Sequence, residues 1–214
     1  MEWNIPNRLT VGRIALAAGF FVLLGAYQSG SRWGPWLLNM AFVVYLLAGL
    51  SDVLDGYLAR KLNLVSAFGR IADPFVDKVL VVGAFVMLAG SNFTLSDGPD
   101  LRLPGWLTGG MASAVQAWMV VVILGREFIV SAVRGYSESC GVTFPATSAG
   151  KIKMFIQSVA ICMVLVQLAN WRGSAWAAGL KVALVWLATI VTLLSGLAYV
   201  RRAKGLMSRG GAGK

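Results

Sequence analysis

Long apolar stretches separated by short polar segments account for most of this 214-residue chain. Six of the stretches are long enough to cross the roughly 30 Å hydrocarbon core of a bilayer as α-helices. They occupy residues 9–27, 36–54, 74–91, 113–133, 152–170 and 178–200. The pattern therefore predicts an all-α integral membrane protein with six transmembrane helices.

The polar segments between these stretches are too short to form a second folded unit. The longest of them, residues 91–112, is rich in Gly, Pro and Asp and is expected to be an external loop. We expect one membrane domain over residues 1–204, followed by a disordered tail over residues 205–214. The first apolar stretch lacks a small-residue cleavage pattern, so we expect it to be retained rather than removed as a signal peptide.

Composition and charge agree with a membrane protein. Hydrophobic residues make up 57% of the chain and charged residues 13%, whereas soluble domains average about 25% charged residues. The formal net charge of +10 fits two roles, attachment to anionic lipid headgroups and attraction of a phosphate-bearing substrate. Attachment is favoured for residues 201–214, and substrate attraction for the basic residues beside the aspartates. No nucleic-acid partner is expected.

The distribution of Lys and Arg predicts an orientation. With six spans both termini share one side, which then holds fifteen basic residues, while the other side holds only Arg32, Arg102, Arg172 and Lys181. Positive residues accumulate on the cytoplasmic side of membrane proteins, so we expect both termini and the segments near 61–72 and 135–150 to be cytoplasmic. Several tryptophans are expected at the opposite interface as an aromatic belt: Trp33, Trp36, Trp106, Trp171 and Trp176.

Four aspartates stand out against this apolar background: Asp52, Asp55, Asp73 and Asp77. A carboxylate within a membrane is costly and is a functional candidate by default. Asp52 and Asp55 are three residues apart and Asp73 and Asp77 four apart, so each pair projects from one face of a helix. A short turn between the two helices makes them antiparallel neighbours, which predicts a cage of four carboxylates near the cytoplasmic surface.

Such a cage suits divalent metal ions. Four carboxylates close together repel one another unless they are protonated or neutralised, and an oxygen-only ligand set suits Mg²⁺, Mn²⁺ or Ca²⁺. Two divalent ions about 3.5–4 Å apart would neutralise the cage and clamp a phosphate group. A proton or ion relay, or salt bridges to nearby Arg and Lys residues, are the alternatives. Gly56, Ala59 and Gly69 favour a bound group, since they permit close approach of a ligand or a second helix.

The same residues form a recognisable motif. The run Asp52-x-x-Asp55-Gly56-x-x-Ala59-Arg60, eight residues, Gly69-x-x-x-Asp73-x-x-x-Asp77 resembles the signature of the CDP-alcohol phosphatidyltransferases at every defined position. Three further segments, NIPNRLTVGRIALA, GREFIVSAVRGYSESCGVTFPA and GKIKMFIQSVAI, resemble the bacterial phosphatidylglycerophosphate synthase subgroup of that family. The similarity extends over about residues 4–204.

The resemblance implies a reaction and roles for the aspartates. Members of the family displace CMP from a CDP-linked lipid by attack of an alcohol on the β-phosphorus, and in this subgroup the substrates are CDP-diacylglycerol and glycerol 3-phosphate. Two Mg²⁺ or Mn²⁺ ions would be held by Asp52, Asp55 and Asp73 together with Asp77. Asp77 would also be the catalytic base that takes the proton of the attacking hydroxyl.

The resemblance also implies residues that bind the CDP-diacylglycerol: Asn7, Thr10, Arg13, Gly56, Ala59, Arg60, Ser66 and Gly69. Arg60 would contact phosphate through a charge-assisted hydrogen bond. Ser66 could equally be an ordinary loop serine, and Asn7 could simply begin a helix.

Four basic residues are candidates for the glycerol-phosphate site: Arg126, Arg134, Lys151 and Lys153. Anchoring to the cytoplasmic headgroups is the alternative role for them. Arg126 and Glu127 carry more weight because they lie deeper within an apolar stretch, where a charge without a partner is costly. Inositol phosphate, serine or phosphatidylglycerol are alternative acceptors.

Two other classes of membrane protein are alternatives for this sequence. A prenyltransferase also uses Asp-rich helices and Mg²⁺, but it does not require the fixed Gly, Ala and Arg positions. An ion-coupled transporter would more often show paired repeats and broken helices. The resemblance further implies a homodimer surrounded by membrane lipids, with its active site on the cytoplasmic side of a bacterial cytoplasmic membrane.

Overall fold

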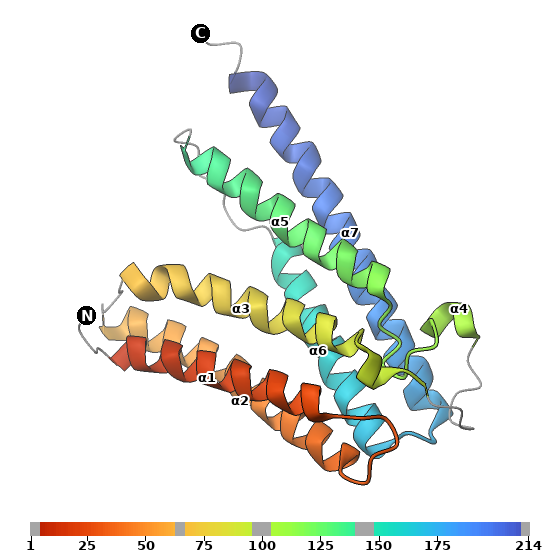
Figure 1. Cartoon of the computed structure of the whole chain (residues 1–214). Helices are drawn as coiled ribbons and strands as arrows, with labels where there is room; N and C mark the ends of the chain where they lie inside the picture. Colours follow the sequence, from red (N-terminus) through yellow and green to blue (C-terminus); the bar gives the residue numbers. More distant parts are fainter. Residues whose placement is uncertain (1–4, 63–66, 96–103, 140–147, 211–214) are drawn as a thin grey trace.

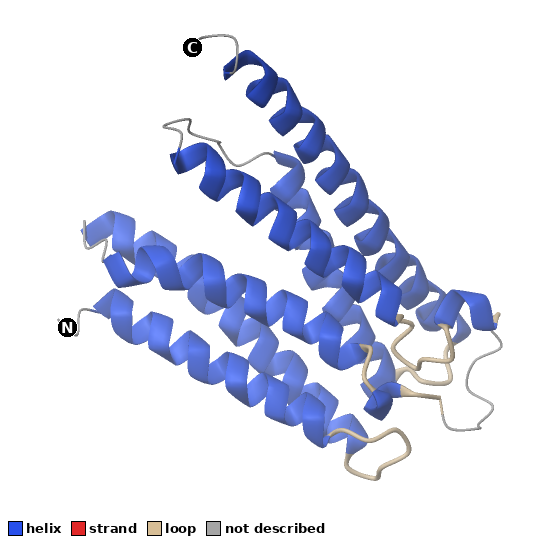
Figure 2. Cartoon of the chain, turned by 45° about the horizontal axis from the view of Figure 1, so that its top comes forward, coloured by secondary structure: helices blue, strands red, loops and turns tan. Residues whose placement is uncertain are grey.

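The computed structural model describes the backbone of residues 5–62, 67–95, 104–139 and 148–210, and side chains over 10–52, 75–95, 104–137, 139 and 150–201. Within these ranges the chain is helical with connecting loops and forms no sheet, as Figure 2 shows. The helices are α1 (Ile5–Ala26), α2 (Gly34–Leu62), α3 (Ala67–Leu88), η1 (Ser91–Phe93), α4 (Gly105–Thr108), α5 (Ala117–Ser139), α6 (Ser148–Asn170) and α7 (Ala175–Gly210). The all-α prediction is confirmed.

The six long helices correspond one to one with the six predicted apolar stretches, but their ends differ. Helix α2 continues past the apolar stretch to Leu62, and α7 continues to Gly210, so residues 205–210 are helical rather than a disordered tail. A run of apolar residues predicts only the part of a helix that suits a membrane core, so it does not predict the polar ends of these helices.

The predicted fourth stretch begins before its helix does. Helix α5 starts at Ala117, and residues 111–115 form a buried, non-helical segment in which Ala114 has φ 61°. Ser113 Oγ donates a hydrogen bond to the carbonyl of Leu88 at 2.6 Å and accepts one from the amide of Val115 at 3.2 Å. These bonds satisfy polar groups that a helix would otherwise satisfy internally.

The long helices form two groups that contact each other. Helix α1 packs against α2 and α3, whereas α5 packs against α7. Helix α6 contacts α7, α2 and α3, and α3 also contacts α5, so both helices connect the two groups (Figure 1). One hydrophobic core runs through all six, with fully buried residues such as Phe20, Leu38, Phe85, Ile123 and Ile161. Toward one end of the bundle α3 and α5 diverge, and a cavity described below opens between them.

Three helical stretches in the described part of the chain are long and apolar enough to cross a membrane: Gly34–Asp52, Gly150–Asn170 and Ala175–Arg201. Large apolar side chains also face outward, among them Val22, Phe128 and Phe155, each 70% exposed. The five tryptophans expected in an aromatic belt are all exposed as well. An outer surface of this composition is suited to lipid rather than water.

A buried cation organises the opposite end of the bundle, near the start of α7. Lys181 is completely buried, and its Nζ donates hydrogen bonds to the carbonyl of Ala112 at 2.5 Å and to Gln167 Oε1 at 2.9 Å. Arg172 donates a hydrogen bond to the hydroxyl of Tyr27 at 2.6 Å and so connects the loop after α6 to the loop after α1. Satisfied donors of this kind hold the loops at this end in place.

Candidate active site

Two of the four aspartates converge on one cation. Asp52 lies on α2 and Asp77 on α3, and the Nη1 atom of Arg13, on α1, lies 2.6 Å from Asp52 Oδ1 and 2.8 Å from Asp77 Oδ1. The Arg13 side chain is 1% exposed, whereas those of Asp52 and Asp77 are 41% and 26% exposed. The two carboxylates therefore sit at the mouth of a site whose floor is a buried guanidinium.

The pattern of α1 explains why Arg13 points inward. Thr10, Arg13, Ala17, Phe20 and Leu24 are all buried and follow one another at spacings of three or four residues. Residues so spaced share one face of a helix, and here that face packs on α2 and α3. A buried charge is tolerated only when it is paired, and the two carboxylates supply the pairing.

The other residues of the predicted nucleotide and metal site are placed only in part. Asp55 and Asp73 belong to α2 and α3, as predicted, but their side chains lie outside the described residues. The side chains of five more predicted residues also lie outside the described residues: Asn7, Gly56, Ala59, Arg60 and Gly69. Ser66 lies outside the described backbone. Among the side chains that the structure describes, no group of three or more His, Cys, Asp or Glu could hold a metal ion.

The chemistry of Asp52 and Asp77 nevertheless suits a cation. Their oxygens approach a single point closely enough for one nitrogen to contact both, and that point carries the positive charge of Arg13. Carboxylate oxygens are also the ligands that Mg²⁺ and Mn²⁺ prefer. With Asp55 and Asp73 on the same two helices, the residues fit a divalent metal site.

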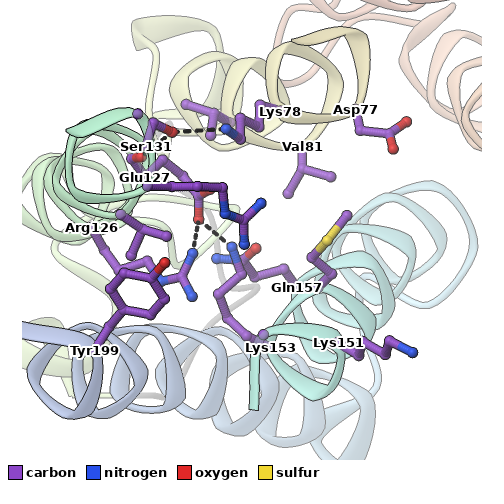
Figure 3. Close-up of a pocket in the computed structure, with 16 residues that line it drawn as sticks. Asp77, Lys78, Val81, Arg126, Glu127, Ser131, Lys151, Lys153, Gln157 and Tyr199 are labelled. Carbon is purple, nitrogen blue, oxygen red and sulfur yellow. Dashed lines mark hydrogen bonds and ion pairs between the residues drawn. The ribbon is translucent and has the colours of Figure 1, made fainter. Parts of the chain in front are cut away.

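A polar cavity of about 610 Å³ opens beside Asp77. Figure 3 shows its walls, which come from α3, α5, α6 and α7. All four residues predicted to bind the glycerol phosphate line it: Arg126 and Arg134 from α5, and Lys151 and Lys153 from α6. The structure thus brings the four predicted basic residues together with the predicted base.

Glu127 is the centre of a charge cluster in this cavity. Its Oε1 accepts a hydrogen bond from Arg126 Nη1 at 3.1 Å and is also contacted by Lys153 Nζ. All three side chains are largely buried, with exposures of 12% for Glu127, 9% for Arg126 and 4% for Lys153. The Nε atom of Arg126 donates a second hydrogen bond, to Ser195 Oγ on α7 at 3.1 Å.

Further polar contacts join the walls of the cavity. Lys78 Nζ donates to Ser131 Oγ at 2.7 Å, which in turn donates to the main-chain oxygen of Glu127 at 2.7 Å. Gln157 Nε2 donates to Thr192 Oγ1 at 2.8 Å. The Nε atom of Arg134 is buried and has no hydrogen-bond partner among the described residues, so it is a donor that a ligand could satisfy.

Sequence reasoning missed three polar cavity residues, Ser131, Gln157 and Tyr199, whereas Lys78 is one of the basic residues beside the aspartates for which substrate attraction is expected. Gln157 carried a usable signal, since it lies one helical turn after Lys153. Ser131 and Tyr199 had none, because an isolated hydroxyl on an apolar helix is compatible with many roles.

An apolar cavity of about 770 Å³ adjoins the polar one. Its walls include Phe21, Phe75, Val79, Val86 and Phe128. The two cavities share a border formed by four residues, Lys78, Val82, Glu127 and Ser131.

Helices with apolar outward faces around a cavity that holds five basic and two acidic residues define a multi-pass membrane protein with a polar site between its helices. The chain belongs to the CDP-alcohol phosphatidyltransferase family, which it matches over residues 3–194. The family resemblance inferred from the aspartate motif is therefore confirmed.

Curated relatives share one name, CDP-diacylglycerol–glycerol-3-phosphate 3-phosphatidyltransferase. The chain is 32% identical to the protein of that name from Bacillus subtilis (strain 168), over 92% of this chain and 93% of the relative. Identity is 31% to that of Shigella flexneri serotype 5b (strain 8401) and 28% to that of Rickettsia prowazekii (strain Madrid E), each over 95% of this chain and 97% of the relative. The similarity covers nearly the whole of each protein.

Proposed function

We propose that this protein transfers the phosphatidyl group of CDP-diacylglycerol to glycerol 3-phosphate, giving phosphatidylglycerophosphate and CMP. Family membership and the names of the relatives support the reaction. The observation that carries the proposal is the position of Asp77, which lines the same cavity as Arg126, Arg134, Lys151 and Lys153. A group able to accept a proton thus lies beside a site suited to a phosphate-bearing alcohol.

The proposed reaction is a single displacement at phosphorus. A hydroxyl oxygen of glycerol 3-phosphate bonds to the β-phosphorus of CDP-diacylglycerol, and the bond from that phosphorus to the oxygen it shares with the α-phosphate breaks. CMP leaves with the bonding electrons, and Asp77 takes the hydroxyl proton. Phosphoryl transfer asks the protein mainly for positioning, charge stabilisation and a base.

Four carboxylates would hold the metal ions in this proposal: Asp52, Asp55, Asp73 and Asp77. When bound, two Mg²⁺ or Mn²⁺ ions would neutralise phosphate oxygens of the donor. The convergence of Asp52 and Asp77 on one positive charge supports a cation site there. Thr10 and Arg13, near that point on α1, would contribute to binding the CDP group together with the signature residues of α2 and α3.

The basic residues of the cavity would bind the phosphate of the acceptor. Arg126 and Lys153 already share Glu127, which leaves the Nη2 group of Arg126 without a partner among the described residues. The buried Nε of Arg134 is a further donor, and Lys151 is exposed at the cavity rim. Charge-assisted bonds from such donors to a phosphate are about twice as strong as neutral ones.

The wider setting is part of the same proposal. The protein would span a bacterial cytoplasmic membrane six times as a single domain, with its termini and active site cytoplasmic, where glycerol 3-phosphate is available. The positive-inside distribution supports this orientation. We also propose a homodimer.

The test is CMP release by purified protein supplied with CDP-diacylglycerol and Mg²⁺ or Mn²⁺. Glycerol 3-phosphate, inositol phosphate, serine and phosphatidylglycerol are offered separately, and chelated samples lack metal. Release that requires both the metal and glycerol 3-phosphate is the expected result. Release with another acceptor would retain the family chemistry and overturn the acceptor, and release without metal would overturn the metal site.

A further inference from the structure

We propose that Glu127 is a positioning residue of the acceptor cavity, whose carboxylate holds Arg126 and Lys153 in the arrangement that binds the acceptor's phosphate. This inference rests on the function proposed above. It assigns a role to an acidic residue in a cavity whose substrate is itself an anion.

Geometry makes Glu127 a shared anchor for two helices. One oxygen, Oε1, is contacted by Arg126 Nη1 from α5 and by Lys153 Nζ from α6 (Figure 3). Arg and Lys side chains each have several rotatable bonds, and fixing one such side chain in a single conformation costs about 1.5–2 kcal/mol of rotamer entropy. The ion pairs with Glu127 offset that cost before the substrate binds.

The backbone at Glu127 and the Arg126 side chain have contacts to two further helices. The main-chain oxygen of Glu127 accepts a hydrogen bond from Ser131 Oγ, and Ser131 accepts one from Lys78 of α3. Arg126 is held from its far side by Ser195 of α7. The cluster thus has contacts to every helix that lines the cavity.

Charge supports the same role. Without the carboxylate, two largely buried cations would face each other and repel, since a low dielectric strengthens Coulomb interactions. With it, the three groups keep a net charge of +1, which still attracts a phosphate. Lys153 also retains hydrogens for a ligand, because an ammonium group has three donors.

The sign of a kinetic change separates positioning from simple electrostatics. A carboxylate near the phosphate site repels the acceptor, so if charge were its only effect, removing it would lower the KM for glycerol 3-phosphate. If it positions the two cations, removing it raises that KM. We expect positioning to dominate, because the negative charge is already paired with two nearer cations.

The main variant is Glu127→Gln, which keeps the size of the side chain and removes its charge. We expect the KM for glycerol 3-phosphate to rise about tenfold or more, as for the loss of a hydrogen bond to a charged group. We expect kcat and the KM for CDP-diacylglycerol to change less than threefold, since neither the base nor the donor site is touched. A fall in the acceptor KM, or an equal rise for both substrates, would overturn the proposal.

Two further variants keep the test decisive. Glu127→Asp retains the charge and shortens the side chain. The acceptor KM should therefore rise if the position of the carboxylate matters, and stay unchanged if only its charge matters. This variant also provides the test if Glu127→Gln does not fold. In a Lys153→Met background, Glu127→Gln should have a smaller effect, because one of its two partners is gone, whereas full additivity would contradict the shared role. Ser137→Ala, which removes only a bond within α5, is the matched control and should behave as wild type.

The same assay keeps the two proposals separate. Wild-type protein that releases no CMP with glycerol 3-phosphate would refute the proposed function, whatever Glu127 does. Wild-type activity combined with a lowered acceptor KM in Glu127→Gln would refute only the positioning role.

Discussion

Arg13 contacts two of the motif aspartates through a single nitrogen, and this has a consequence for which substitutions the site tolerates. Both contacts are made by Nη1, at 2.6 Å to Asp52 and 2.8 Å to Asp77, so the planar fork of the guanidinium is not needed for them. An ammonium group at the same point could serve both carboxylates.

We therefore expect Arg13→Lys to keep more of the stability than Arg13→Met, which should lose about 1–3 kcal/mol, less than for a fully buried pair because both carboxylates are partly exposed. The measurement is the thermal unfolding midpoint in detergent without divalent cations. Added Mg²⁺ should recover part of the loss in Arg13→Met, since a metal ion would take over the neutralisation. Equal destabilisation by Lys and Met would contradict this account of the contact.

Asp77 differs from Asp52 because it also faces the polar cavity. Asp77→Asn removes the proposed base while leaving a group of the same size, so we expect transfer to fall by about 10²–10⁴-fold, the usual contribution of a general base. Binding of CDP-diacylglycerol, followed by ligand-induced thermal stabilisation, should persist. Substantial retained transfer would remove Asp77 as the base.

At this scale the sequence predicted which residues lie near one another better than how they pair. The spacing of the aspartates placed Asp52 and Asp77 together, and the four basic cavity residues were identified before their cavity was visible. The pairing of Arg13 with Asp77 could not be predicted, because the two are 64 positions apart and their contact depends on how α1 packs against α3. Glu127 showed only as a charge within an apolar stretch, since its partner Lys153 belongs to another helix.

Helix α7 has a glycine, Gly196, where it packs against Arg126 of the cavity wall. A Cβ placed on Gly196 would lie 3.0 Å from Arg126 Cγ and 3.6 Å from Arg126 Cβ, so the glycine leaves room for the stem of the arginine. Arg126 in turn reaches Ser195 on the same turn of α7. The α5–α7 contact is therefore part of the positioning of Arg126.

We expect Gly196→Val to displace Arg126 and to raise the KM for glycerol 3-phosphate about threefold or more, since small misplacements of a binding group reduce rates strongly. Gly179→Val is the matched control, because it lies on the same helix and its Cβ would meet nothing within 4 Å. Acceptor and donor KM values are measured for both variants. An equal effect of the two substitutions would indicate a general loss of helix packing rather than a local one.

The sequence predicts the helices correctly wherever a run of apolar residues is enough to define them. Every long helix was predicted, because a membrane core requires internally hydrogen-bonded segments of a minimum length. The buried segment 111–115 was assigned in part to a helix, since it is as apolar as one. Its hydrogen bonds go to Ser113 and to distant groups such as Lys181, which no local pattern reveals.

On the scale of the whole molecule, the two groups of helices carry different parts of the proposed chemistry. Helices α1–α3 hold the aspartates and the predicted donor site, whereas α5–α7 supply the basic walls of the acceptor cavity. Asp77 and Lys78 of α3 line that cavity. Helices α3 and α5 diverge toward this end of the bundle (Figure 1). Transfer between a lipid and a soluble phosphate thus needs both groups, which meet where α6 contacts α2 and α3 and where α5 contacts α3.

The proposed orientation gives a prediction for the intact cell. The basic residues gather toward the end of the bundle that holds the cavity, and the exposed tryptophans Trp33, Trp106 and Trp171 lie in or beside the loops of the other end. By the positive-inside rule we expect the cavity end to be cytoplasmic. Ser139, at the end of α5, and Gly173, between α6 and α7, are both exposed and mark the two ends.

Single cysteines at these positions test it, in a background with Cys140 and Cys162 replaced by Ser. We expect a membrane-impermeant maleimide to label Gly173→Cys in intact cells and to label Ser139→Cys only after the membrane is opened. Because four of the proposed spans, α1, α2, α3 and α5, lie between the N-terminus and Ser139, a cysteine added at the N-terminus should behave like Ser139→Cys. Labelling of Ser139→Cys from outside would reverse the orientation and would separate the cavity from cytoplasmic glycerol 3-phosphate, so the proposed reaction would lose its soluble substrate.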